Sequence, residues 1–526
     1  MSNITYRKSI KEDIPSINDL FIEMIKTVNS RMEREGEITY ENLGTGFEEG
    51  YLDRFYINDD RLIYVALDDD KVIGFISIVN NKEYANIYLD DYCVNESYRG
   101  QGIGSKLMQI SFKFAKQQGY DQVITHVEIN NYESIEFYRK KGFKLVQKQG
   151  HRLLIRRVDN HLSEEKQNEL KEKNNKILSK ILYKIKNEYP DKVDMVAIGG
   201  TFCNGLYHEK SDFDVVIIAN DNIDDISKCF ILDGIGQDIY YTFWDRFEHM
   251  AEYENMFSTK LKELEVVYYR NEEVLSKYKQ LQEELDINMN NIEKNKETIN
   301  KYLNSIISKK NSINKTDNLN ELYKLVGSLM NDIENVLFIN NKLYLFGGTK
   351  NILAELSFMV NIPDNFIGYY KRILDLNSIS DIKEWVNSIV SILLTYFNKE
   401  DNNLYEEESN NFEKKEITRN DLIGTYEELY SNYYNKLVYA SNNNNKYLSF
   451  RTMIDAQGFF DEFTSQFNMP EFNLMEKYKP YDLQANIDEF TKLLNKWKDL
   501  YDKFQIDVEK YDSIEELYSI SSNKTL

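Results

Sequence analysis

The chain has 526 residues, too many for one hydrophobic core, so we expect about three domains. Apolar residues make up 42% of it, with 39 Tyr and 28 Phe, which excludes wholesale disorder. The net charge of −22 disfavours a nucleic-acid-binding surface, because phosphate backbones attract clustered Lys and Arg. A cationic partner would suit this charge better, although surplus acid also simply keeps proteins in solution.

The cysteines and the N-terminus indicate the compartment. Cys93, Cys203 and Cys229 show no CxxC spacing and no neighbouring His pair, so we expect free thiols in a reducing cytosol rather than a zinc site. The N-terminus lacks the apolar core of a signal peptide, and no stretch has the roughly 18 apolar residues of a membrane span. We therefore expect a cytoplasmic protein with no membrane contact. The oligomeric state cannot be predicted.

The first part of the chain alternates predicted helices and strands. Leu62–Leu67 and Val72–Ile78 flank a polar turn, which predicts a β-hairpin. A polar stretch from about residue 160 then leads into Ile177, Ile181 and Ile185 at helical spacing. We place the first domain at residues 1–158.

A second set of strands follows. We predict strands at Val193–Ile198, Asp212–Ile218, Asp238–Phe243 and Leu264–Arg270, which form a small mixed α/β domain over residues 162–285. After it strands largely vanish, and an apolar stripe in 322–336 predicts an amphipathic helix of a bundle. The predicted fold class is therefore multidomain, two α/β domains followed by an all-α helical bundle over residues 286–526.

One glycine loop lies between a predicted strand and a predicted helix. The strand Asn86–Val94 is followed by Arg99-Gly100-Gln101-Gly102-Ile103-Gly104-Ser105 and then a helix. Glycines let the backbone approach a ligand, and the unpaired N–H groups at a helix start favour a pyrophosphate. This order predicts a phosphate site.

The loop resembles motif A of the GNAT acetyltransferase family, through Arg99, Gly102 and Gly104. The resemblance to the family extends from residue 4 to 157. Asn131, Tyr138 and Gly142-Phe143 match the downstream pattern of that family. The resemblance implies a GNAT fold that binds acetyl-CoA and transfers its acetyl group to an amine. It also implies contacts of CoA with the following residues: Cys93, Val94, Arg99, Gly100, Gln101, Gly102, Ile103, Gly104, Ser105 and Asn131.

The resemblance further implies catalytic roles. Tyr138 would be the general acid that protonates the departing thiolate. Of Asp90 and Asp91, only one can enter the cleft, because adjacent strand residues point oppositely. We favour Asp91, which would accept the proton of the amine or anchor a cationic acceptor, against a merely solvated carboxylate. Four glutamates fall where the family builds its acceptor wall, but a solvated charged face is the simpler interpretation: Glu33, Glu35, Glu37 and Glu41.

A second constellation follows the strand Val193–Ile198. Asp212 and Asp214 share one face of a predicted strand, which suits hard divalent cations that clamp oxygens during phosphoryl transfer. With the preceding Gly199-Gly200-Thr201, this resembles the polymerase-β-like nucleotidyltransferase superfamily, of the antibiotic (kanamycin) nucleotidyltransferase type. The resemblance implies a small mixed-sheet fold followed by a helical region that holds the acceptor pocket.

The resemblance also implies the roles of single residues. Gly199, Gly200, Thr201 and Ser211 would contact the triphosphate of an NTP, taken to be ATP. Asp212, Asp214 and Asp238 would bind Mg²⁺, and Asp238 could instead deprotonate the acceptor hydroxyl; Asp233 and Asp245 are weaker alternatives. Glu334 in the helical region could orient a hydroxyl, but a surface position is the simpler expectation.

These patterns predict a bifunctional transferase. It would move acetyl to an amine and a nucleoside monophosphate to a hydroxyl, on a polycationic small molecule such as an aminoglycoside-like antibiotic, hence a role in antibiotic resistance. Two alternatives remain open. The chain could have only one active domain that acts on a protein or tRNA acceptor, or it could be a regulator that binds CoA and nucleotide without turnover.

Overall fold

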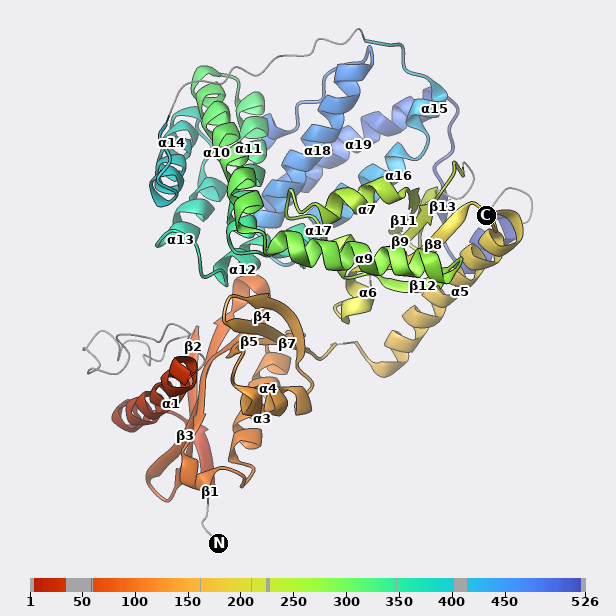
Figure 1. The fold of residues 1–526 in the computed structure, drawn as a ribbon. Helices are drawn as coiled ribbons and strands as arrows, with labels where there is room; N and C mark the ends of the chain where they lie inside the picture. Colours follow the sequence, from red (N-terminus) through yellow and green to blue (C-terminus); the bar gives the residue numbers. More distant parts are fainter. Residues whose placement is uncertain are drawn as a thin grey trace. The chain divides into compact units, whose positions relative to one another are not determined.

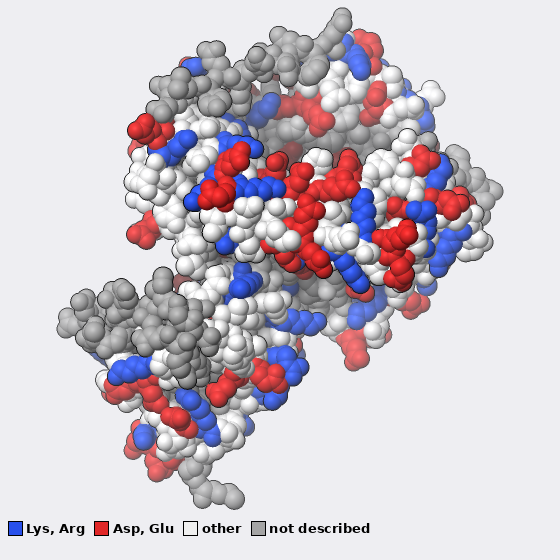
Figure 2. All heavy atoms as spheres, in the orientation of Figure 1, with Lys and Arg blue, Asp and Glu red and all other residues white. Residues whose placement is uncertain are grey.

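The computed structural model describes residues 4–34, 58, 60–160, 162–209, 211–223, 228–346, 348–401 and 414–521. The chain divides into two compact units, residues 1–163 and 164–526 (Figure 1). Within the described ranges, no helix has the length and apolar character needed to cross a membrane. On the face shown in Figure 2, Lys and Arg are interleaved with Asp and Glu rather than gathered into one basic patch.

The first unit is a mixed sheet with helices on both faces. The strand order is β1-β2-β3-β4-β5-β7-β6, with β4 and β5 parallel and the other neighbours antiparallel. Its elements are β1 Ile4–Lys8, α1 Ile14–Arg34, β2 Arg61–Asp68, β3 Lys71–Asn81, β4 Asn86–Val94, α3 Ile103–Gln117, β5 Gln122–Glu128, α4 Tyr132–Lys140, β6 Lys144–Gln149 and β7 Arg152–Val158.

Alternating apolar residues in the central strands build two cores, one on each face of this sheet. In β2, Ile63 and Val65 pack with α1, whereas Leu62 and Ala66 belong to the core that α3 and α4 complete. Successive strand residues point to opposite faces, so a strand that is apolar throughout requires helices on both sides. The predicted hairpin is confirmed, because β2 pairs with β3 from Arg61 to Asp68.

The second unit contains a mixed sheet of order β12-β8-β9-β11-β10-β13, followed in sequence by helices. Its sheet region comprises α5 Glu164–Glu188, β8 Val193–Ile198, α6 Gly200–Asn204, β9 Val215–Ala219, β10 Lys228–Leu232, β11 Ile235–Thr242, α7 Trp244–Ala251, α8 Thr259–Lys262 and β12 Glu265–Tyr269. The predicted strand at Val193–Ile198 matches β8. The strand predicted from Asp212 begins three residues later, at Val215.

The helical region supplies most of the remaining residues. Its elements are α9 Glu272–Met289, α10 Ile292–Lys315, α11 Leu319–Asn340, α12 Ile352–Ser357, α13 Phe366–Lys371, α14 Ile379–Tyr396, α15 Arg419–Leu422, α16 Thr425–Leu429, α17 Asn435–Asn442, α18 Lys446–Gln466, α19 Leu483–Lys503 and α20 Ile514–Ser521, with strand β13 Lys510–Tyr511 before α20. The apolar stripe predicted in 322–336 is buried within α11.

The predicted division between residues 285 and 286 falls inside α9, and the residues on both sides belong to the second unit. A strand near the end of the chain explains part of this continuity. β13 pairs in parallel with β10, so the chain returns to the sheet after the helices. A two-residue strand gives no periodic signal, and the sequence pattern therefore did not predict it.

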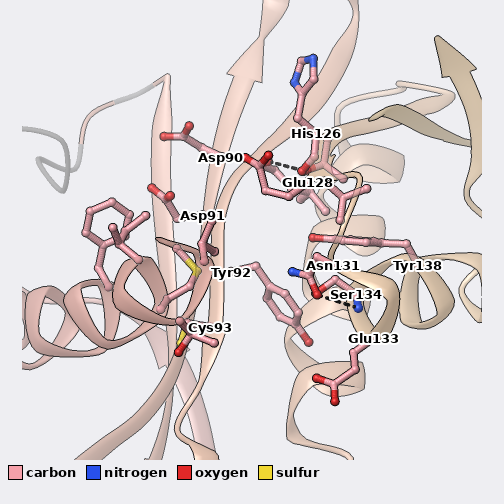
Figure 3. A pocket seen from close by; sticks show the side chains of 18 of the residues that line it. Asp90, Asp91, Tyr92, Cys93, His126, Glu128, Asn131, Glu133, Ser134 and Tyr138 are labelled. Carbon is pink, nitrogen blue, oxygen red and sulfur yellow. Dashed lines mark hydrogen bonds between the residues drawn. The ribbon is translucent and has the colours of Figure 1, made fainter. Parts of the chain in front are cut away.

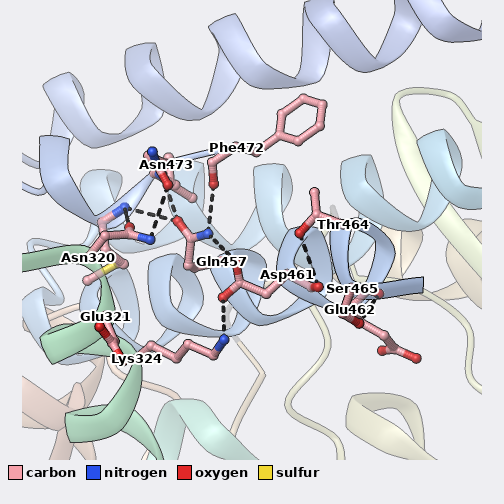
Figure 4. Close-up of polar contacts among 12 residues, drawn as sticks. Asn320, Glu321, Lys324, Gln457, Asp461, Glu462, Thr464, Ser465, Phe472 and Asn473 are labelled. Atoms are coloured by element: carbon pink, nitrogen blue, oxygen red, sulfur yellow. Dashed lines mark hydrogen bonds and ion pairs between the residues drawn. The ribbon is translucent and has the colours of Figure 1, made fainter. Parts of the chain in front are cut away.

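Buried amides and charges fix the helical region. Figure 4 shows the side chain of Gln457, which is fully buried and donates to the carbonyl of Phe472 at 2.7 Å. Its Oε1 accepts from the Leu474 amide at 2.7 Å, and it also donates to Asp461, which forms an ion pair with Lys324 at 3.1 Å. The segment after α18 is thus tied to α11 and α18, because a buried amide is stable only when it is hydrogen-bonded.

Candidate active sites

The first candidate site lies where β4 and β5 separate. β5 pairs with β4 only from Asn86 to Leu89, although both strands continue beyond that point. At the same place β4 has one extra residue, Asp90, because Ser77 pairs with Asp91 and Ile78 with Leu89. Bulges bend a strand and end its pairing on one side. A cavity of about 370 Å³ opens there and is lined by residues of both strands.

The glycine loop joins β4 to α3, in the order that the sequence predicted. Gly100 and Gly102 have φ of 78° and 80°, in the left-handed region that favours glycine, and Gly102 caps α3. The Arg99 side chain donates from Nε to the Val94 carbonyl at 3.1 Å, which ties the loop to the end of β4. The N-terminus of α3 therefore begins beside the separated edge of β4, as a pyrophosphate site requires.

Six of the twelve predicted residues of this site line one cavity, and the other six belong to the glycine loop and the start of α3. Asp91, Cys93, Val94, Arg99, Asn131 and Tyr138 line the cavity. The segment 100–105 starts α3 but is not part of the lining, and within it Ile103 is a core residue that is 1% exposed. Asn131 also has a structural task, because its side chain caps α4 by accepting from the Ser134 amide at 3.2 Å.

Tyr138 lines the cavity, and its role as general acid stays a prediction. The residue is 6% exposed, and Figure 3 shows its hydroxyl directed away from α4 toward the strand that carries Asp91 and Tyr92. Burial raises the pKa of Tyr138 to about 12, although a hydrogen bond with Thr125 lowers it in part. The phenol therefore keeps its proton at neutral pH and can donate it.

Asp90 and Asp91 differ in their surroundings. Asp90 forms an ion pair with Arg61, whereas Asp91 is 6% exposed, lies beside Tyr138 and raises the pKa of that phenol. Both residues line the cavity, together with Glu128 and Glu133. The preference for Asp91 stays a prediction. Of the predicted acceptor wall, Glu35, Glu37 and Glu41 and the side chain of Glu33 lie outside the described residues.

The sequence pattern missed a histidine at this site. His126 Nδ1 lies 3.0 Å from the Tyr88 hydroxyl, and His126 Nε2 lies 2.9 Å from Gln149 Oε1. Burial lowers the pKa of His126 to about 4, so the imidazole is neutral at physiological pH. Tyr88 and His126 are 38 residues apart and match no motif, and the only signal was a polar residue within an apolar strand.

The second candidate site lies at the sheet of the second unit. Asp238 lies on β11 and Asp214 directly precedes β9, and these strands pair in parallel with Ile239 opposite Val215. Burial, with the charges of Asp212 and Asp238, raises the pKa of Asp214 to about 6. The predicted shared strand face for Asp212 and Asp214 is wrong, since both lie in the loop before β9, where the Phe213 amide donates to Gln237.

Gly200 has a φ of 68°, which favours glycine, and both Gly199 and Gly200 are crowded by a neighbouring side chain. A β-carbon on Gly200 would lie 1.8 Å from the Asp214 carboxylate, and one on Gly199 would lie 2.7 Å from Leu264. Gly199, Gly200, Thr201 and Asp214 line a cavity of about 580 Å³. Ser211 does not line it; its hydroxyl accepts from the His208 amide at 2.9 Å and so serves the turn.

Basic side chains line the same cavity, from α7, α8 and the segment after α11. Arg246, Lys260 and Lys350 are cationic, and the pKa of His249 is raised by its hydrogen bond to the Asp245 carbonyl. The buried Thr201 hydroxyl has no hydrogen-bond partner among the described residues, so it is available to a bound ligand. In the same described ranges, no group of three or more His, Cys, Asp or Glu could hold a metal ion, so the three aspartates do not form a preassembled metal site.

The family comparison agrees with the geometry of the first unit. Residues 31–143 match the Acetyltransferase (GNAT) family, so the chain contains a GNAT acetyltransferase domain. The match covers none of the second unit, and the nucleotidyltransferase stays a prediction.

Curated relatives and a solved structure are similar to the same part of the chain. The probable N-acetyltransferase san of Drosophila melanogaster is 33% identical over 19% of this chain and 58% of its own length. N-alpha-acetyltransferase 30 of Schizosaccharomyces pombe is 30% identical over 18% and 65%. The chain thus spans less than two thirds of these relatives. The PaiA N-acetyltransferase of Thermoplasma acidophilum, solved with coenzyme A, is 22% identical over 30% of this chain and 99% of its own, with a TM-score of 0.26.

Proposed function

We propose that the first unit transfers the acetyl group of acetyl-CoA to a primary amine. The main observation behind this proposal is the cavity where β4 and β5 separate. Tyr138, Tyr88 and His126 all line it, and Tyr88 is hydrogen-bonded to His126. The cavity also fits the cosubstrate. Beyond Leu89, β4 presents backbone groups that β5 does not pair, and a pantetheine amide would satisfy them.

The residues of the cavity supply the proton transfers that the reaction needs. Attack of the amine nitrogen on the thioester carbon releases a proton, which passes to the Tyr88 oxygen as the Tyr88 proton moves to His126 Nδ1. Breakage of the C–S bond then leaves a thiolate, which takes the proton of Tyr138. Solvent then reprotonates Tyr138 and takes up the proton held on His126 Nδ1, which restores both groups. Asp91 would hold the incoming amine near the thioester.

The acceptor is the part of the proposal with two candidate classes. Two relatives are named N-alpha-acetyltransferases, which favours the α-amine of a polypeptide. The carboxylates that line the cavity also suit a polycationic small molecule of the aminoglycoside type. Two of these carboxylates form ion pairs with arginines, Asp90 with Arg61 and Glu128 with Arg152. The net negative charge of the cavity is therefore smaller than the number of its carboxylates suggests. We therefore place the peptide amine first.

The experiment measures thiol release from acetyl-CoA with a panel of N-terminal peptides, polyamines and aminoglycosides, followed by mass spectrometry of each product. An acetyl gain of about 42 Da, the formula mass of C₂H₂O, identifies the acceptor class, and its loss in Tyr138→Phe assigns it to this cavity. If the chain binds acetyl-CoA but acetylates no amine, the regulator alternative replaces the enzyme.

A second function, nucleotidyl transfer by the second unit, is favoured by one observation. Three aspartates lie close enough to repel one another, next to a cavity lined by Arg246, Lys260 and Lys350 and by a Thr201 hydroxyl that lacks a partner among the described residues. A Mg²⁺ ion would relieve the repulsion and offset the charge of a triphosphate. Asp212, Asp214 and Asp238 would hold it.

The chain's own residues in that cavity divide into two tasks. Gly199, Gly200 and Thr201 allow close approach of phosphate to the backbone, and Lys260 and Arg246 balance its charge. Apolar residues of the same lining, among them Phe257 and Phe346, would contact the base.

The test of this second function incubates the chain with Mg²⁺, each NTP in turn and the acceptor found above, and follows pyrophosphate release. Transfer that requires Mg²⁺ and disappears in Asp214→Asn supports it. Acetyl transfer without any nucleotidyl transfer leaves an enzyme with one active domain, the alternative that the sequence left open.

A further inference from the structure

His126 is held between two neutral side chains from different strands. The Tyr88 hydroxyl on β4 reaches Nδ1 at 3.0 Å, and Gln149 Oε1 at the end of β6 reaches Nε2 at 2.9 Å. The register explains how a residue two strands away reaches the imidazole. His126 and Gln147 both lie opposite Leu154 of β7, so Gln149, two residues further, shares their face of the sheet.

These two contacts determine which nitrogen of His126 carries the proton. An amide oxygen only accepts hydrogen bonds, so the nitrogen that faces Gln149 Oε1 must be the donor. A neutral imidazole has one N–H, and Nδ1 is therefore the bare nitrogen. Nδ1 accepts a hydrogen bond from the Tyr88 hydroxyl. A proton that leaves the substrate through Tyr88 would move in the same direction, toward Nδ1.

We propose that Gln149 is a positioning residue, whose amide oxygen holds His126 in the Nε2–H tautomer and so keeps Nδ1 free to take the Tyr88 proton. This inference rests on the proposed acetyl transfer, because only that reaction gives the relay a purpose. Gln149 is 5% exposed and does not line the cavity, so it acts through His126 rather than on substrate.

The surroundings of His126 keep the imidazole neutral. What Gln149 can determine is therefore which of the two ring nitrogens carries the single proton. Burial lowers the pKa of His126, the hydrogen bond with Gln149 raises it by less, and the charge of Arg152 on β7 lowers it further. Arg152 is itself paired with Glu128 of β5, which also lies 3.6 Å from His151. Asp90 of β4 is matched by Arg61.

The first test reads the tautomer directly, without activity. The full chain is labelled with ¹⁵N-histidine, which gives only five side-chain spectra, and long-range ¹H–¹⁵N correlations are recorded at about pH 7.5 for wild type, His126→Gln (to assign the signal), Gln149→Leu and the control Gln147→Leu. We expect the Nε2–H pattern in wild type and Gln147→Leu, and loss of that single tautomer in Gln149→Leu. An Nδ1–H pattern in wild type, or an unchanged pattern in Gln149→Leu, overturns the proposal.

The second test uses Gln149→Glu, whose carboxylate also accepts from Nε2–H. This variant keeps the tautomer but favours imidazolium, so the acidic limb of the pH profile of kcat moves to higher pH. Gln149→Leu lowers kcat by about 10-fold or more with little change in the KM for acetyl-CoA. If Gln149→Glu is as slow as Gln149→Leu at every pH, the positioning role is wrong. A chain with no transferase activity ends the proposed function but leaves the tautomer readout to decide what Gln149 does.

Discussion

Gly104 lies directly against the phenol of Tyr92, because a β-carbon on Gly104 would come within 2.0 Å of the Tyr92 hydroxyl oxygen. The contact joins the first turn of α3 to the end of β4. The sequence motif takes glycine or alanine at this position, and the Tyr92 contact leaves room only for glycine in this chain. The close approach lets the N-terminus of the helix face the separated edge of β4.

Gly104→Ala should therefore disturb the CoA site more than the fold. Tyr92 is stacked on Phe137 and has to shift, which we expect to cost about 1–3 kcal/mol of stability and to weaken CoA binding by about 10-fold. Calorimetric titration with CoA and thermal unfolding measure both. Gly458→Ala on α18, where a β-carbon meets nothing within 4 Å, is the matched control. Equal CoA affinity in the two variants would contradict the prediction.

Tyr138→Phe should reduce kcat by about 100-fold or more and leave the affinity for acetyl-CoA unchanged, because it removes only the proton given to the thiolate. Tyr132→Phe on the same helix serves as the control, since that side chain is 72% exposed. Steady-state kinetics with the identified acceptor supply the measurement. A full rate in Tyr138→Phe would require another acid.

Acid should destabilise the first unit through His126. The folded-state pKa of about 4 lies below the ordinary value of 6.5, so between these pH values the unfolded chain binds a proton that the folded chain does not. Stability therefore falls as pH falls through this window, by about 1–3 kcal/mol once partial exposure is allowed for. Urea unfolding at about pH 7 and about pH 4.5 should show a smaller loss in His126→Gln than in wild type. The same loss in both would assign the acid sensitivity to other groups.

The two sites should fail separately. Asp214→Asn is expected to abolish Mg²⁺-dependent nucleotidyl transfer and to spare acetyl transfer, whereas Asp233→Asn, in the β10–β11 turn, should spare both. In buffer with EDTA, Asp214→Asn should also raise the melting temperature, because it removes one of three repelling carboxylates. Loss of acetylation in Asp214→Asn would refute independent sites.

The sequence predicted what short segments determine and missed what distant segments build. The loop from Arg99 to Ser105 was predicted, because turn, glycines and helix start follow one another along the chain. The Tyr88, His126 and Gln149 arrangement was not, since it depends on strand order and on a register that places residues of β4, β5 and β6 on one face. The bulge at Asp90, which opens the cavity, leaves no periodic signal either.

Glu334 shows the same limit in the helical region. We expected it at the surface, beside the apolar stripe of its helix, but it is fully buried and accepts hydrogen bonds from Tyr370 at 2.5 Å and Tyr447 at 2.6 Å. Arg451, which is 4% exposed, lies 3.6 Å from it. The apolar periodicity of one helix gives no information about the side chains that other helices place against it, here Arg451, Tyr370 and Tyr447.

Glu334→Ala should consequently destabilise the second unit by about 3–5 kcal/mol, because it removes the carboxylate that pairs with the buried Arg451 and leaves Asp455 as the remaining carboxylate that acts on it. Glu321→Ala, at an exposed position of the same helix, should change stability by less than about 0.5 kcal/mol. The double variant Glu334→Leu with Arg451→Met removes both charges together and should recover much of the loss, as measured by urea unfolding. If the double variant is less stable than Glu334→Ala, the pair contributes more than charge compensation, and the hydrogen bonds from Tyr370 and Tyr447 to Glu334 stabilise the unit more than the ion pair does.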